Sequence, residues 1–335
     1  MPRKVILDCD PGHDDAVAIL LAYGNPEVEL LAITTVAGNQ TLDRTTLNAR
    51  RVCTVAGIRD VPVAAGCDRP LLRELITAAH VHGESGLDGP SWPEPDVPLA
   101  DVHAVDLIID LLLASDREVT LLPTGPLTNI ALAVRREPRI VSRVQEVVLM
   151  GGSATRGNQT PAAEFNVLVD PEAAAIVFEA GWPLTMVGLD LTRQARVTPE
   201  VLNRLLRLGS PLSRVVVQML EAYRDHHRRQ SVDPPGLHPG IWPGELEREP
   251  PLHDPCAVAR VIEPTCVECV EAFVAVETQG RWTSGMTVTD FRPSPGRPFN
   301  ARVATRLDVD RFWDLVVSAV ERVGLDAARS GGSTA

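Results

Sequence analysis

This 335-residue sequence lacks the features typical of nucleic-acid-binding and membrane proteins. Its 32 Lys and Arg against 44 Asp and Glu give a formal net charge of −12, which argues against nucleic acid or an anionic membrane as a partner. No apolar run reaches the ~18 residues of a membrane span. The N-terminus has no charged region followed by an apolar stretch and a cleavage site. We therefore expect a cytoplasmic protein that binds neither nucleic acid nor membranes.

Cysteine and lysine are also scarce. The six cysteines have no spacing typical of a disulfide framework. Cys266 and Cys269 form a CxxC pair, but no second pair or nearby histidine pair completes a zinc site. They lie in an apolar, β-branched stretch where buried cysteine is common, so we expect a structural role. Lys4 is the single lysine, which excludes chemistry that depends on one elsewhere.

One short segment concentrates negative charge. Residues 8–15 read Asp-Cys-Asp-Pro-Gly-His-Asp-Asp and follow the apolar run 5–7. At an effective dielectric of about 20, two like charges ~4 Å apart repel by roughly 4 kcal/mol. The segment contains no Lys or Arg, so a hard cation bound by oxygen ligands would explain it. The alternative is a solvated acidic turn, with Asp14 and Asp15 at the positive end of the next helix.

The hydrophobic pattern of the first half predicts an α/β fold. Apolar runs predict strands over residues 4–9, 29–36, 61–65, 119–122, 144–150 and 183–189. Amphipathic segments predict helices over residues 14–23, 41–56, 127–135 and 171–180. This alternation indicates an open, mainly parallel, Rossmann-like sheet with helices on both faces. Polar clusters follow the strands at their carboxyl ends, where ligands bind in such sheets, so we expect the active site there.

The second half predicts helices over residues 212–228 and 309–323 and another that opens with residues 252–255. It also predicts strands over 266–276, 286–289 and 301–306. Residues 231–251 are rich in Pro, Gly and His, and we expect a mobile active-site loop there. No repeat or linker interrupts the pattern. We therefore expect one domain over residues 1–326 and a disordered tail over 327–335.

Several sequence blocks carry a resemblance to a known family. They are residues 8–15, 37–39, 82–87, 123–129 and 150–152, Asn158 with 164–166, and 253–254. The chain resembles the calcium-dependent nucleoside hydrolases of the inosine–uridine-preferring type, and the blocks occur in family order. Cys9 departs from the Thr common at its position, between the carboxylates. The resemblance implies hydrolysis of the N-glycosidic bond of ribonucleosides to base and ribose by a homodimer or homotetramer.

The resemblance also implies a metal site and a water-activating base. Asp10, Asp15, Asp254 and the backbone carbonyl of Thr124 match the Ca²⁺ ligands, and all supply the hard oxygens that Ca²⁺ prefers. Asp10 would also take the proton from the calcium-bound water. That water would attack the anomeric carbon with inversion, through an oxocarbenium-like transition state.

Further positions match the substrate contacts of the family. Asp14 and Asn39 would hold the 2′-hydroxyl side of the ribose, and Asn166 the 3′-hydroxyl. The 5′-hydroxyl would bind Asn158 and Glu164. Met150 and Phe165 lie in the same blocks and complete the implied substrate contacts.

The leaving base needs a proton or a place for negative charge. His253 and His82 could each donate, because histidine titrates near neutral pH. The resemblance favours His253 as the acid and His82 as a base-side contact. Tyr223 and His227 match base-contacting positions in a weakly aligned region. Position 83 is Gly and Trp242 lies in the loop, so no tryptophan pair is available for a purine, and we expect a non-specific or pyrimidine-leaning enzyme.

Two other interpretations compete with this one. Asp8-Cys9-Asp10 mimics the Asp-x-Asp of haloacid-dehalogenase-like phosphatases. That chemistry needs a lysine at the site, whereas Lys4 precedes the strand. A non-catalytic nucleoside- or sugar-binding protein would need the ribose-binding groups but has no use for a dense carboxylate cluster with a metal.

Overall fold

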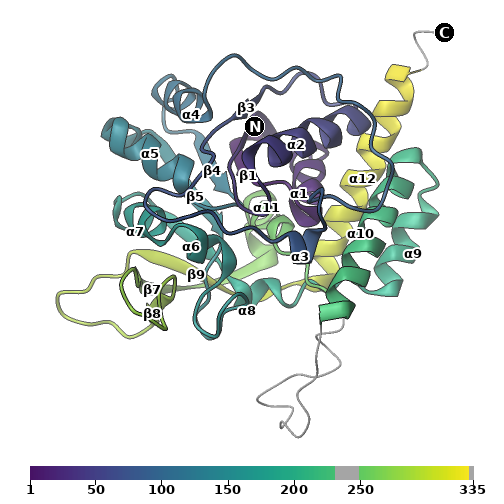
Figure 1. Cartoon of the computed structure of the whole chain (residues 1–335). Coiled ribbons are helices and arrows are strands. Elements are labelled where there is room, and N and C mark those ends of the chain that lie inside the picture. Colours follow the sequence, from purple (N-terminus) through teal and green to yellow (C-terminus); the bar gives the residue numbers. More distant parts are fainter. Residues whose placement is uncertain (231–248, 332–335) are drawn as a thin grey trace, which may run out of the picture.

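The computed structural model describes residues 1–230 and 249–331, and these residues build a nine-stranded sheet in the order β3-β2-β1-β4-β5-β6-β9-β7-β8 (Figure 1). The strands are β1 (Arg3–Cys9), β2 (Val28–Thr35), β3 (Val63–Ala65), β4 (Val119–Pro123), β5 (Val144–Met150), β6 (Leu184–Val187), β7 (Val267–Val276), β8 (Thr287–Asp290) and β9 (Ala301–Leu307). All neighbouring pairs from β3 to β9 are parallel, and β7 is antiparallel to both β9 and β8. The predicted mainly parallel α/β fold is confirmed.

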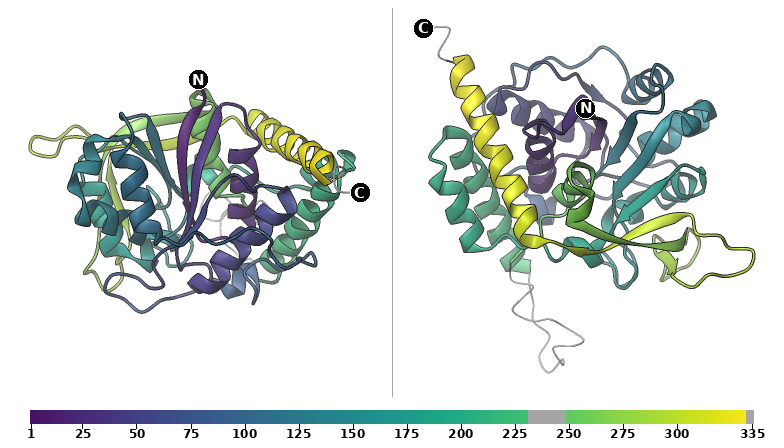
Figure 2. Two further views of the ribbon diagram at one scale, coloured as in Figure 1. Left: turned by 90° about the horizontal axis from the view of Figure 1, so that it is seen from above. Right: turned by 180° about the vertical axis from the view of Figure 1, so that it is seen from behind.

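Helices cover both faces of the sheet (Figure 2). One face packs against α1 (His13–Tyr23), α2 (Leu42–Ala56), α9 (Pro199–Arg207), α10 (Pro211–Gln230), α11 (Asp254–Ile262) and α12 (Val309–Gly331). The other face packs against α4 (Ala104–Leu113), α5 (Thr128–Arg136) and α7 (Pro171–Glu179). Shorter helices are α3 (Ala79–His82), α6 (Phe165–Val169) and α8 (Leu189–Thr192), with 3₁₀ turns at Pro138–Ser142 and Pro264–Cys266.

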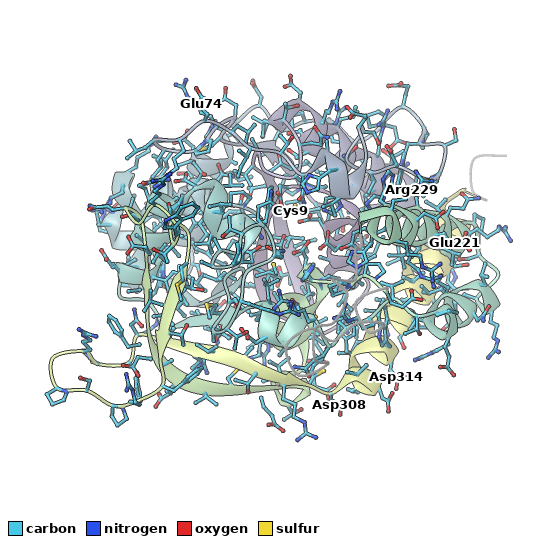
Figure 3. All side chains as sticks on the ribbon, turned by 60° about the horizontal axis from the view of Figure 1, so that its bottom comes forward. Cys9, Glu74, Glu221, Arg229, Asp308 and Asp314 are labelled. Atoms are coloured by element: carbon cyan, nitrogen blue, oxygen red, sulfur yellow. The ribbon has the colours of Figure 1, made fainter. Side chains whose placement is uncertain are left out.

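Strand β1 shows why the central strands are unbroken apolar runs. Val5, Leu7 and Cys9 belong to the core on one face, and Ile6 belongs to the core on the other. Successive side chains of a strand point to opposite faces, so a strand covered on both sides must be apolar throughout. Cys9 accordingly lies among packed side chains, whereas Glu74 and Asp314 lie at the periphery (Figure 3).

The register of β1 aligns the carboxyl ends of three strands. Asp8 pairs with Thr34 of β2 and with Pro123 of β4. The loops that follow these strands therefore leave the same edge of the sheet. The segments 10–15, 36–39 and 124–126 meet there, as the sequence predicts.

The observed helices differ from prediction in several places, and the short helices α3, α6 and α8 were also not predicted. Helix α4 was not predicted, and its sequence AVDLIIDLLL buries Ala104, Val105, Ile108 and Leu112 at helical spacing. Helix α12 continues to Gly331, so residues 327–331 are helical rather than part of a disordered tail, and Ala327 lies next to Gly57. Residues 332–335 and most of the predicted mobile loop, 231–248, lie outside the described residues.

The end of that loop is anchored in the described part of the chain. Glu249 bonds to Arg224 and Arg228, and the Pro251 carbonyl accepts from Tyr223. All six cysteines are free, as expected for structural residues. Among the described residues, none of the helices combines the length and apolar character that a membrane span requires.

Candidate active site

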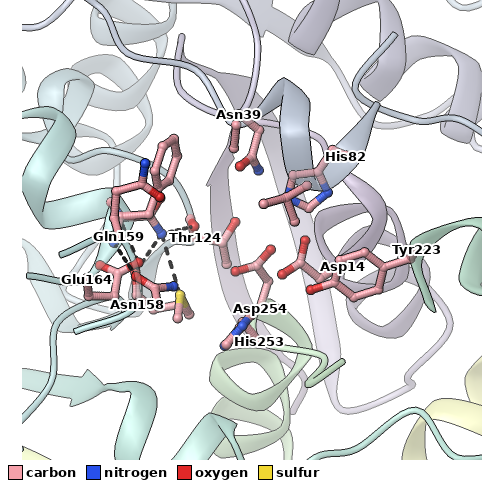
Figure 4. A pocket seen from close by; sticks show the side chains of 15 residues that line it. Asp14, Asn39, His82, Thr124, Asn158, Gln159, Glu164, Tyr223, His253 and Asp254 are labelled. Carbon is pink, nitrogen blue, oxygen red and sulfur yellow. Dashed lines mark hydrogen bonds between the residues drawn. The ribbon is translucent and has the colours of Figure 1, made fainter. Parts of the chain in front are cut away.

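A pocket opens at the carboxyl ends of the parallel strands (Figure 4). The space between its walls is about 500 Å³, open solvent included. The side chains that line it come from loops, helices and a strand end spread over most of the chain. They are Asp14, Asn39, Ala78, Val81, His82, Thr124, Met150, Asn158, Gln159, Glu164, Phe165, Asn166, Tyr223, His253 and Asp254.

The acidic turn lies at the floor of this pocket and is not solvated. Asp10 and Asp15 are fully buried, and Asp14 and Asp254 are 5% and 4% exposed. Gly12 caps α1, and its amide donates to Asp15 in the first turn of the helix. The interpretation as a water-exposed helix cap is therefore wrong, since burial removes the solvent that would screen these charges.

Three carboxylates converge on one point. One oxygen from each of Asp14, Asp15 and Asp254 lies within 4.8 Å of the others. Burial is the main factor that raises the pKa of Asp14 to about 6 and of Asp15 to about 7. Burial is also the main cause that holds the pKa of Asp254 well above its usual range, and the negative charges of Asp14 and Asp15 raise it further. These groups cannot all be ionised without a nearby positive charge.

Asp10 lies directly beside this group. Its Oδ2 accepts from the Asn39 amide at 2.6 Å, while its buried Oδ1 has no hydrogen-bond partner among the described residues. A β-carbon at Gly125 would lie 2.6 Å from that Oδ1, and one at Gly38 would overlap Oδ2. Burial and the charge of Asp15 raise the pKa of Asp10 well above its usual range.

The donor set fits a hard cation. Asp10 Oδ1 and Asp14 Oδ1 are both buried and have no hydrogen-bond partner among the described residues. The clustered atoms that could ligate a metal are carboxylate oxygens, which a hard cation prefers. The grouping differs from the predicted ligand set of Asp10, Asp15, Asp254 and Thr124, because Asp14 joins the closest cluster. Thr124 donates its hydroxyl to Asp15 at 2.9 Å, and its carbonyl accepts from Asn166 at 2.7 Å.

The predicted ribose contacts all line the pocket. Asn39 donates to the Asp10 carbonyl and to the Asp15 carboxylate. Asn166 donates to the carbonyls of Thr124 and Met150. Amide side chains held in this way have fixed donors and acceptors for hydroxyl groups.

Glu164 and Asn158 are fixed by the start of helix α6. Glu164 is its N-cap and accepts from the amides of Gly152, Asn166 and Val167. Burial raises the pKa of Glu164 to about 6. Asn158 accepts from the Phe165 amide at 3.0 Å, and Phe165 itself lines the pocket.

His82, Tyr223 and His253 also line the pocket (Figure 4). The Nδ1 of His253 lies 2.7 Å from the hydroxyl of Thr192 in α8. Burial is the main cause that lowers the pKa of both His82 and His253 to about 3. Tyr223 is buried and donates to the Pro251 carbonyl.

One predicted contact does not line the pocket. His227 lies one turn beyond Tyr223 toward the C-terminal end of α10, and its charge is among the causes that lower the pKa of His253. Three lining residues were missed: Ala78, Val81 and Gln159. The sequence could have indicated them, because each lies close to a predicted site residue. Ala78 and Val81 lie four residues and one residue before His82, and Gln159 directly follows Asn158.

Comparisons with known proteins agree with this geometry. The family model of the inosine-uridine preferring nucleoside hydrolases matches residues 5–314. An inosine-uridine preferring nucleoside hydrolase of Leishmania major is 52% identical over 97% of this chain and 99% of its own length. A pyrimidine-specific ribonucleoside hydrolase of Shewanella is 46% identical over 96% of each chain. The solved structure of a purine-preferring ribonucleoside hydrolase from Gardnerella vaginalis superposes with a TM-score of 0.86 at 30% identity, covering 96% of this chain and 99% of its own.

Proposed function

The chain belongs to the inosine-uridine preferring nucleoside hydrolase family and cleaves the N-glycosidic bond of ribonucleosides, and we propose that it does so at this pocket with a bound Ca²⁺. The observation that carries the proposal is the buried carboxylate cluster, whose unpartnered oxygens lie under side chains suited to a sugar. Neither competing interpretation accounts for both features. A phosphatase would need a lysine at the site, and a binding protein would not need the buried charge.

In this proposal Asp10, Asp15, Asp254 and the Thr124 carbonyl hold the cation, with Asp14 beside it. When bound, the cation offsets the carboxylate charges and makes water at the site more acidic. Asp10 takes the proton of the attacking water. Its bare Oδ1 supports this role, because the Asn39 amide already occupies the other oxygen.

The remaining polar residues orient the ribose. Asp14 and Asn39 bind at the 2′-hydroxyl, Asn166 at the 3′-hydroxyl, and Asn158 with Glu164 at the 5′-hydroxyl. Met150 and Phe165 pack beside the sugar. Water then attacks the anomeric carbon from the face opposite the base, and positive charge develops on the ring, which the surrounding carboxylates stabilise.

Base departure is assigned to the histidine side of the pocket. His253 donates the proton, held by Thr192, and His82 contacts the base. Tyr223 shapes this side through its ring. His227 remains a proposed base contact from α10, near enough to His253 for its charge to lower the pKa of that residue.

The metal proposal is tested by removing Ca²⁺ and by replacing Asp10. We expect about one Ca²⁺ per chain in protein purified without chelator, loss of hydrolysis on chelation, and recovery on adding calcium. Asp10→Asn should lower kcat by more than the ~10²–10⁴-fold of general base catalysis alone, because metal binding also weakens. Asp314→Asn, an exposed ion-pair residue, is the matched control and should leave kcat unchanged. Full activity without calcium would contradict the mechanism.

Base preference is tested by kcat/KM for inosine, adenosine, uridine and cytidine. We propose a non-specific or pyrimidine-leaning enzyme, because the described pocket lining includes no tryptophan to stack on a purine. The names of the relatives include an inosine-uridine preferring, a pyrimidine-specific and a purine-preferring hydrolase, so they cover both purine and pyrimidine bases. A purine preference above ~100-fold, about 2.7 kcal/mol of transition-state discrimination, would refute this proposal.

We further propose that residues 1–326 act as one domain, in the cytoplasm, as a homodimer or homotetramer. Light scattering of the purified protein measures the oligomeric state directly.

A further inference from the structure

A buried hydroxyl outside the parallel part of the sheet reaches the loop that carries Asn158 and Glu164. It belongs to Thr287, which opens the edge strand β8 of the antiparallel β7–β8 ribbon and is 2% exposed. Its Oγ1 accepts from the Ser153 amide at 2.8 Å and donates to the Ser153 carbonyl at 2.7 Å. Buried backbone groups need such partners, so Thr287 fixes both polar groups of a residue 134 positions away.

Thr287 also packs against the residue before Ser153. Gly152 has a φ of +73°, which side-chain-bearing residues rarely adopt. A β-carbon there would lie 2.8 Å from both Oγ1 and Cγ2 of Thr287. The backbone of residues 152–153 therefore lies directly against Thr287, through van der Waals contact on one residue and two hydrogen bonds on the next.

This turn holds the carboxylate of Glu164, which lines the pocket together with Asn158 (Figure 4). The Gly152 amide donates to Oε2 of Glu164 at 2.9 Å. The carboxylate also accepts from the amides of Asn166 and Val167, but these follow Glu164 in its own helix α6. The bond from Gly152 is the one of these three that fixes the carboxylate relative to the sheet.

The same ribbon contacts the far end of the loop. Gly285 lies just before β8, and a β-carbon there would be 2.8 Å from Cα of Leu168 in α6 and 3.1 Å from Cβ of Ala163. Ala163 precedes Glu164, and its carbonyl accepts from the Asn158 amide at 3.2 Å. The ribbon therefore touches the loop both before Asn158 and beside Glu164.

We propose that Thr287 is a positioning residue that holds the turn at Gly152, and through it the Glu164 carboxylate, in place for the 5′-hydroxyl of the substrate. Thr287 acts through Glu164 and does not touch the substrate itself. The inference rests on the proposed function, in which Asn158 and Glu164 bind the 5′-hydroxyl. It adds that the antiparallel ribbon, and not only the parallel sheet, determines how tightly the sugar is recognised.

The test compares two variants of the calcium-loaded enzyme that differ in the hydroxyl. Thr287→Val keeps the size of the side chain and removes the hydroxyl, whereas Thr287→Ser keeps the hydroxyl and removes the methyl group. Thr287→Val should raise KM for uridine roughly tenfold, the usual effect of one lost hydrogen bond, with a smaller effect on kcat. Thr287→Ser should remain close to the wild-type enzyme in both constants.

5′-Deoxyuridine separates positioning from a general loss of structure. It lacks the hydroxyl that Glu164 would bind, so its KM should change little in Thr287→Val. The matched control is Thr289→Val in the same strand, where the lost hydroxyl contacts the Thr287 carbonyl at 3.3 Å, and KM should not change for either substrate. Calorimetry checks that each variant folds, and Thr287→Ala is a second variant without the hydroxyl. Equal rises in KM for both substrates, or a lower Tm with unchanged KM, would overturn the inference.

A double-mutant cycle tests whether Thr287 acts through Glu164. Glu164→Ala removes the carboxylate, so Thr287→Val should raise KM for uridine no further in that background. Additive effects would overturn the inference. The wild-type enzyme shows separately whether the proposed function fails: equal KM for uridine and 5′-deoxyuridine would refute the 5′-hydroxyl assignment, and the inference with it. A wild-type preference for uridine that Thr287→Val leaves unchanged would refute the positioning role alone.

Discussion

The reactive side chains of this site are held in position by the residues that pack directly against them. Asp10 lies where a side chain at Gly38 or Gly125 would collide with its carboxylate, so both positions need glycine. His253 shows the same principle through a hydrogen bond, because the Thr192 hydroxyl holds its Nδ1. The reactive groups are thus oriented before substrate binds, which lowers the reorganisation needed during reaction.

At this scale we predict that His253→Ala slows nucleosides but barely affects p-nitrophenyl riboside. The phenolate leaves without a proton, whereas a nucleobase needs one. General acid catalysis is worth ~10²–10⁴-fold, so the two substrates should respond very differently in kcat. His103→Ala provides the control for a general histidine effect. Equal losses on both substrates would mean that His253 supports the metal site through Asp254 and is not the acid.

Among the secondary-structure elements, the short helix α8 links the two sides of the pocket. Thr192 contacts His253 on one side. Asp190 accepts from Ser153, Ala154 and Thr155, and Arg193 donates to the carbonyls of Arg156 and Gly157. Helix α8 therefore fixes the loop that leads to Asn158 and Glu164.

We predict that Asp190→Ala weakens recognition of the 5′-hydroxyl. Releasing the loop should raise KM for uridine by about tenfold, equivalent to ~1.4 kcal/mol, with a smaller effect on kcat. 5′-Deoxyuridine lacks the group that the loop positions, so its KM should change less. Asp314→Ala removes only an exposed ion pair with Arg204 and should leave both values unchanged. Equal KM changes for both substrates would argue against this role of α8.

For the whole molecule, the buried carboxylates link stability to pH and to the metal. Burial raises the pKa of Asp8 and Asp15 to about 7, and holds those of Asp10 and Asp254 well above the usual range. Carboxyl groups of an unfolded chain titrate near pH ~3.9. The cation-free folded state therefore binds more protons than the unfolded state at neutral pH, and its free energy of unfolding falls as pH rises.

We predict that the cation-free protein loses thermal stability between pH 6.5 and 8. The buried histidines have pKa values near 3 and oppose this trend only below the unfolded histidine pKa of about 6.5, so the carboxylates dominate in the chosen window. Bound calcium favours the ionised carboxylates and should cancel the loss. Differential scanning calorimetry with chelator or with calcium, at fixed ionic strength, measures both curves. A Tm that rises with pH in chelator would contradict this account.

The sequence by itself determined the sheet and the edge where the site lies. Strands buried on both faces must be apolar throughout, and the carboxyl ends of parallel strands share one edge, so both features can be read from local sequence. The blocks at residues 8–15 and 164–166 also identified the chemistry through the family they resemble. Helix α4 was missed because partly buried Leu and Ile residues flank its buried face, so only Asp106 and Asp110 mark the polar side in the sequence.

Only the tertiary structure decided which groups meet and how deeply they are buried. Asp254 joins Asp14 and Asp15 because α11 and α1 pack together, a contact that no local pattern encodes. The same is true of His13, which only the fold brings against His82 and Tyr223. Burial then sets the pKa of each group, because desolvation depends on everything packed around a side chain and not on its neighbours in sequence.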